Sequence, residues 1–168
     1  RTLLDSGRFS YSASFAANVA KLETLAIQDV DIVTIAYGTN DYIGRKPPGT
    51  ASDQTTSTFA GDLNRGIRAL QAANPDLEII LYTPPWRWNP ASIGGGDAAQ
   101  EPNAQGIYLS QFAQVILNVG QSRGFAVVDV YNKSGISKST YSQYLADGVH
   151  LNAAGYTRTN SMLLDLIR

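Results

Sequence analysis

Apolar residues recur along the chain in blocks whose spacing alternates between that of helices and that of strands. The first block follows a helical period at Phe15, Val19, Leu22 and Ala26. A nearly continuous apolar run at 32–37 comes next and predicts a strand. Because this strand is apolar at almost every position, we expect helices to cover both of its faces, as in a parallel sheet.

The same alternation of helix and strand continues after a loop at 44–56 that is rich in Pro, Gly, Ser and Thr. Ser57 or Thr58 caps the next predicted helix, which Asn74-Pro75 ends ahead of a strand at 78–83. The apolar face of this helix consists of Phe59, Leu63, Ile67 and Leu70.

A second long loop, 84–105, leads into a third predicted helix, which stops at Gly124 before a strand at 125–131. A short segment at 137–144, a polar turn and a last helix at 153–166 follow. The apolar face of the third helix consists of Tyr108, Phe112, Val115, Ile116 and Val119.

Strands that alternate with helices at this spacing predict an α/β fold of three layers around a doubly wound parallel sheet, as in flavodoxin-like proteins. The 168 residues favour one domain, 1–168. The first visible strand has no exposed-edge character, so we expect another strand to pair with it. The chain starts at Arg1 without a methionine. We therefore expect N-terminal strands to be missing and an upstream segment of the same polypeptide to complete the sheet.

The amino-acid composition excludes several classes of binding partner. Thirteen basic and fourteen acidic residues give a net charge of -1, which leaves no broad positive field for nucleic acid. No apolar run approaches the roughly 20 residues of a membrane span. With no cysteine and one histidine, the chain lacks thiolate and multi-histidine metal sites, and we expect no metal. The low charge, with many Ser, Thr, Asn, Gly and Tyr residues, suits a secreted or extracellular bacterial protein.

Two short motifs carry candidate chemistry. Gly38-Thr39-Asn40-Asp41 follows the first strand, and ligands of parallel sheets bind at the carboxyl ends of strands. The alternative is an ordinary turn, since Gly, Asn and Asp are common turn residues.

Asp147-Gly148-Val149-His150-Leu151-Asn152 holds the one histidine, and its carboxylate is placed to orient the imidazole as a general base. The alternative is a turn in which Asp147 bonds local backbone amides.

Together the segments 35–41 and 147–152 resemble the two downstream blocks of the SGNH (GDSL-type) serine hydrolases, and the resemblance covers nearly the whole chain. It implies a cofactor-free esterase or acylhydrolase of SGNH-type fold that acts on small-molecule or carbohydrate esters, including O-acetyl groups. It also implies that Asn40 donates to the oxyanion hole, His150 is the general base and Asp147 orients it. Gly38 and Asp41 are their motif neighbours.

The first block of that family, Gly-Asp-Ser after the first strand, is absent from this sequence. Ser6-Gly7 resembles the second block, which makes Gly7 a candidate oxyanion-hole residue, although that glycine could also precede Arg1. We therefore expect the nucleophilic serine upstream. The alternative is a non-catalytic carbohydrate-binding or structural domain that kept the fold without the nucleophile.

Aromatic residues beside the motifs are candidates for a substrate rim. Trp86 and Trp88 lie in the loop after the second visible strand, and Tyr42 follows Asp41. Aromatic faces at such a rim stack on sugar rings, but tryptophans beside prolines equally suit a packed loop.

Overall fold

The computed structural model describes residues 24–89 and 95–168. The predicted helix from Phe15 lies almost entirely outside these residues, and the described part opens with a 3-10 helix, η1 (Ile27–Asp29). Three strands form a parallel sheet in chain order: β1 (Ile32–Ala36), β2 (Glu78–Tyr82) and β5 (Ala126–Val128). The predicted parallel α/β sheet is confirmed.

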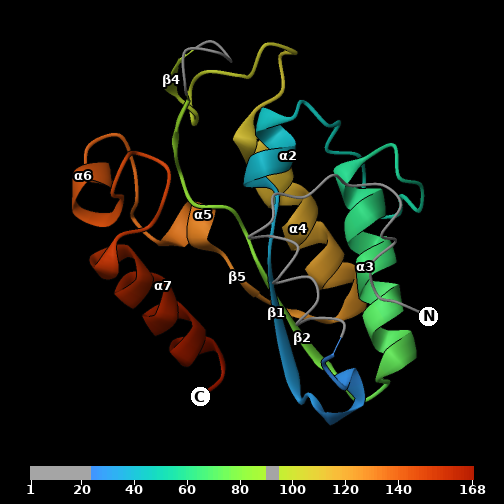
Figure 1. Cartoon of the computed structure of the whole chain (residues 1–168). Coiled ribbons are helices and arrows are strands. Elements are labelled where there is room, and N and C mark those ends of the chain that lie inside the picture. The colour runs from blue at the N-terminus through green and yellow to red at the C-terminus, as the bar shows by residue number, and fades with distance from the viewer. Residues whose placement is uncertain (1–23, 90–94) are drawn as a thin grey trace.

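Helices lie on both sides of this sheet (Figure 1). α3 (Phe59–Ala73) and α4 (Leu109–Arg123) cover one face, and α7 (Ala153–Leu166) lies on the other. Alternate residues of β2 divide between the two sides: Ile79 and Leu81 belong to the core beneath α3 and α4, whereas Ile80 packs with Val128. The three predicted layers are therefore present, and β2 is buried on both faces as the continuous apolar run requires.

β1 is less covered than its sequence predicts. Ile35 is buried against α3 and α4, but Ile32 is 47% exposed. The reason is the position of α7, which contacts β5 at the far end of the sheet. Among the described residues, β1 pairs with β2 alone. A further strand beside β1 stays a prediction.

Capping residues set the ends of the long helices where the sequence places them. Thr58, rather than Ser57, caps α3 by accepting a hydrogen bond from the Gly61 amide at 3.1 Å. α4 ends at Gly124, whose φ of 70° is the left-handed conformation that glycine adopts without strain. Predicted and observed limits of these helices therefore agree closely.

The short elements are the ones that the apolar pattern does not predict. α2 (Thr39–Ile43) directly follows β1, and the loop at 84–105 contains an antiparallel pair, β3 (Trp88–Asn89) and β4 (Gly96–Asp97). The third strand stops early because Asp129 caps α5 (Val130–Lys133). The segment at 137–144 contains a single helical turn, α6 (Tyr141–Tyr144). No helix within the described residues is long and apolar enough to cross a membrane.

Candidate active site

The first half of the site lies at the carboxyl end of β1. Gly38 joins β1 to α2 with a φ of 113°, a conformation that residues with a Cβ rarely adopt. This turn places Asn40 in the first turn of α2, where it is exposed. Asp41 is half-buried, and burial raises the pKa of its carboxyl. The motif therefore presents an uncharged amide donor at the strand end.

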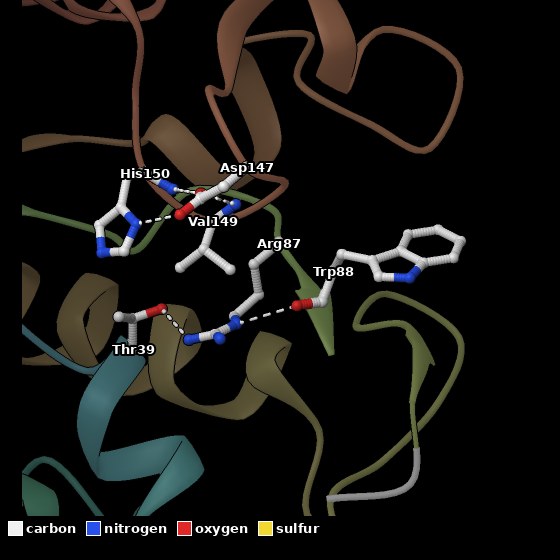
Figure 2. Close-up of polar contacts among 6 residues, drawn as sticks. All are labelled: Thr39, Arg87, Trp88, Asp147, Val149 and His150. Atoms are coloured by element: carbon white, nitrogen blue, oxygen red, sulfur yellow. Dashed lines mark hydrogen bonds and ion pairs between the residues drawn. The ribbon is translucent and has the colours of Figure 1, made fainter. Parts of the chain in front are cut away.

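The second half is the turn that carries His150, drawn in Figure 2. Oδ1 of Asp147 accepts hydrogen bonds from the backbone amides of Val149 at 2.9 Å and His150 at 2.8 Å. Oδ2 lies 2.7 Å from Nδ1 of His150. These bonds hold the pKa of Asp147 far below its usual range, with the His150 amide as the main cause.

An ionised Asp147 can only accept, so Nδ1 of His150 carries the proton at this contact and Nε2 is left as the acceptor nitrogen. The His150 side chain is 78% exposed, and its second ring nitrogen faces away from Asp147 (Figure 2). The predicted contact between carboxylate and imidazole is present. The hydrogen bonds from local backbone amides, which the alternative interpretation predicts, are present as well, because the two oxygens of Asp147 make both kinds of contact.

The turn is fastened to β3. The amide of Trp88 donates to the carbonyl of Gly148 at 2.7 Å. Gly148 has a φ of 81°, and a Cβ at this position would lie 3.1 Å from the Cβ of Trp88. Both the backbone conformation and the close approach of β3 therefore favour glycine at this position.

Both motifs border one pocket of about 300 Å³ at the carboxyl ends of β1 and β2. Asn40 and Asp41 line it from the first motif and Leu151 lines it from the second, whereas Asp147 and His150 are not among its lining residues. Tyr82 from β2 and Tyr156 from α7 complete much of its wall. The fold thus brings together two segments that lie far apart in the sequence.

Two of the predicted rim residues are buried, which corrects their assignment. Tyr42 is fully buried, and its hydroxyl accepts a hydrogen bond from Nδ2 of Asn89 at 2.8 Å. Trp86 is 3% exposed, and its indole donates to Asp97 at 2.6 Å. Polar partners inside the protein satisfy both polar tips, so these side chains pack beneath the loop.

Trp88 is 37% exposed, but its ring already has neighbours. It stacks on Tyr141 with ring centres 5.9 Å apart and an angle of 23°, and Nζ of Lys138 lies 5.8 Å from its centre. A sugar ring would therefore compete with these contacts, and a rim role for Trp88 stays a prediction.

Arg87 is a residue near the site that the sequence did not single out. It is 5% exposed, and a guanidinium hydrogen bond joins it to Thr39, the neighbour of Asn40. Arginine is usually solvated, so sequence carries no signal of this burial. Gly7 lies outside the described residues. Among the described residues, no group of three or more His, Asp or Glu side chains is placed to hold a metal ion.

Comparison with known proteins points to one family. The model of the GDSL-like lipase/acylhydrolase family matches residues 6–158. The chain is also 29% identical over 143 residues to an isoamyl acetate-hydrolyzing esterase 1 homolog from Bos taurus, covering 80% of this chain and 55% of that protein. The chain thus spans about half the length of this relative.

Solved structures share the fold. A possible lipase from Chitinophaga pinensis superposes with a TM-score of 0.68 at 20% identity, covering 92% of this chain and 77% of that one. A peptidoglycan O-acetylesterase superposes with a TM-score of 0.56 at 20% identity, covering 92% of this chain and 40% of that one. At these identities the structural likeness supports the α/β architecture.

Proposed function

The chain belongs to the GDSL-like lipase/acylhydrolase family, and from this premise we propose that it supplies the general base and an oxyanion-hole donor of a serine esterase. In this proposal His150 is the base, Asp147 orients it, and Asn40 donates to the oxyanion. The nucleophilic serine is contributed by a segment upstream of Arg1. A parallel strand beside β1 would end next to Gly38 and Asn40, so a serine at the end of that strand would lie close to the Asn40 amide.

The observation that carries this proposal is the 2.7 Å contact between Oδ2 of Asp147 and Nδ1 of His150. It fixes the tautomer that leaves Nε2 as the proton acceptor, which a general base needs. The two backbone amides at Oδ1 keep the carboxylate ionised. The negative charge then stabilises the imidazolium that forms when His150 takes the serine proton.

The reaction divides the labour between the two motifs. His150 removes the proton from the serine hydroxyl as the oxygen attacks the ester carbonyl, and then donates it to the departing alcohol. Negative charge collects on the carbonyl oxygen, where the Asn40 amide donates a hydrogen bond worth about 3 to 4 kcal/mol in the transition state. Water then cleaves the acyl-enzyme by the same steps, with His150 again as the base.

For the substrate class we propose short-chain esters, with acetyl as the first candidate acyl group. Support comes from two similar proteins, whose names specify hydrolysis of isoamyl acetate and removal of O-acetyl groups from peptidoglycan. A pocket of about 300 Å³ at the low end of the usual range for ligand pockets also suits a small acyl group.

The test is hydrolysis of p-nitrophenyl acetate by the full-length polypeptide. His150→Ala should abolish turnover, and Asn40→Ala should lower kcat by about two to three orders of magnitude with a smaller change in KM. Asn118→Ala is the matched control, since Asn118 is an exposed asparagine on α4. It should retain full activity.

Two results would exclude the esterase and favour the non-catalytic binding domain. One is unchanged hydrolysis by the His150→Ala protein. The other is wild-type protein that neither hydrolyses esters of any chain length nor reacts with a fluorophosphonate probe for activated serines. Comparing p-nitrophenyl acetate with the octanoate ester tests the acyl group separately, and we expect a higher kcat/KM for the acetate.

A further inference from the structure

Arg87 is a buried cation without a carboxylate partner among the described residues. It is 5% exposed, and the ion pairs found in 24–89 and 95–168 do not include it. A buried guanidinium normally has a carboxylate partner, because the loss of hydration has to be compensated. Burial without such a partner does not favour stability, so we look for another purpose at this position.

The guanidinium makes two long hydrogen bonds. Nε donates to the carbonyl of Trp88 at 3.4 Å, and one terminal nitrogen donates to Oγ1 of Thr39 at 3.5 Å. Burial lowers the pKa of Arg87, while electrostatic interactions with the Tyr42 hydroxyl and the Asp147 carboxylate act in the opposite direction. Arginine remains ionised even so.

These contacts place Arg87 between the two halves of the site. Figure 2 shows its side chain running beneath the Asp147–His150 turn toward Thr39. Thr39 precedes Asn40 in α2, and Trp88, which follows Arg87, holds Gly148 through its amide at 2.7 Å. Two adjacent residues of one loop therefore contact both segments that carry the proposed catalytic side chains.

We propose that Arg87 is a positioning residue that sets the spacing between Asn40 and His150 through its hydrogen bond to Thr39. The flat, rigid guanidinium suits this task better than a lysine ammonium, which presents its donors from a single point. Its kinetic consequence rests on the proposed esterase function, since an oxyanion donor and a base act on the same ester group. A small displacement of either lowers the rate sharply.

The kinetic test compares Arg87→Lys, Arg87→Met, Thr39→Val and the double variant Arg87→Met/Thr39→Val. Each single variant should lower kcat for p-nitrophenyl acetate by about tenfold with KM within about twofold. The double variant should be no slower than Arg87→Met alone, because both changes break one link. Arg123→Met is the matched control: Arg123 donates to Asn64 and joins α4 to α3, helices that carry none of the proposed catalytic side chains.

A second measurement does not depend on activity. In protein labelled with ¹³C-histidine, the ring signal of His150 is identified by its loss in His150→Ala. Thr39→Val should shift this signal in the wild-type background and leave it in place in the Arg87→Lys and Arg87→Met backgrounds. Equal shifts in all backgrounds, or no shift in any, would overturn the link through Arg87.

The two proposals fail in different ways. If His150→Ala still hydrolyses the ester, the esterase proposal is wrong. The NMR signal of the His150 ring then tests the role of Arg87 by itself. If the kcat loss of the double variant equals the product of the two single losses, or if Arg87→Lys keeps the wild-type kcat, Arg87 has only a packing or charge role. The esterase proposal stands in either case.

Discussion

Replacing Asp147 with asparagine changes one atom of the site and should disable the base. The wild-type carboxylate accepts three hydrogen bonds, two at Oδ1 from the amides of Val149 and His150 and one at Oδ2 from Nδ1 of His150. An asparagine offers one oxygen and one NH₂ group in the same places. The asparagine oxygen has to stay at the backbone amides of Val149 and His150. If the NH₂ group pointed there instead, it would face two N–H groups and none of the three could accept a hydrogen bond.

The NH₂ group then faces the His150 ring at 2.7 Å. Nδ1 has to accept, so the ring proton moves to Nε2, the nitrogen that should receive the serine proton. A base locked in the wrong tautomer in this way costs about 10⁴-fold in kcat in a serine protease triad, and we expect a loss of about 10³- to 10⁴-fold here with little change in KM.

The assay is hydrolysis of p-nitrophenyl acetate by Asp147→Asn, wild type and a matched control. Asp53→Asn is that control: hydrogen bonds from Thr50 and Thr58 likewise lower the pKa of Asp53, but no histidine contacts it in the described structure. The control should keep wild-type kcat. A loss below about tenfold in Asp147→Asn would refute the tautomer argument.

Three further predictions concern stability. Phe112→Ala should lower the free energy of unfolding by about 3 to 5 kcal/mol in urea titrations, because Phe112 is fully buried; a loss under 1 kcal/mol would contradict its core position. Gly148→Ala should displace the turn from Trp88 and lower both Tm and kcat, since its φ is 81° and the new Cβ meets Trp88 at 3.1 Å; wild-type values of both would count against the close approach. Because the folded-state pKa of Asp147 is lowered, its stabilising effect is present above the unfolded pKa of about 3.9 and is lost as pH falls through the folded value. The Tm difference between wild type and Asp147→Asn should therefore be largest at neutral pH and shrink below about pH 4, and a difference independent of pH would show that the carboxylate charge is not involved.

Elements with a long apolar period were predictable, and those held by tertiary contacts were not. α3 and α4 each have 15 residues with an apolar face and a recognisable stop, so local sequence defines them. α2 and the β3–β4 pair are too short to show a period. The third strand looked longer than it is because Val130 and Tyr131 continue its apolar run. In the structure the Tyr131 amide instead donates to the Thr83 hydroxyl, outside the sheet.

The candidate site divides in the same way. Asp147 and His150 lie three residues apart, so a local turn suffices to bring them into contact, and the sequence predicts it. Burial of Tyr42 depends on Asn89, a residue 47 positions away that satisfies its hydroxyl. Burial of Arg87 next to Thr39 depends on a separation of 48 positions. Neither separation leaves a periodic trace that could be recognised in the sequence.

The amide proton of Trp88 donates to the carbonyl of Gly148, so its exchange rate reports on the contact that holds the His150 turn against β3. Asn40 follows β1, a strand of the central sheet, whereas the turn with His150 contacts β3, a strand of two residues within a loop. Amide hydrogen exchange depends on how often a bond opens locally. Protection at Trp88, compared with that of Leu81 in β2, would thus measure how often the contact between β3 and the His150 turn opens, at physiological temperature and without any substrate present.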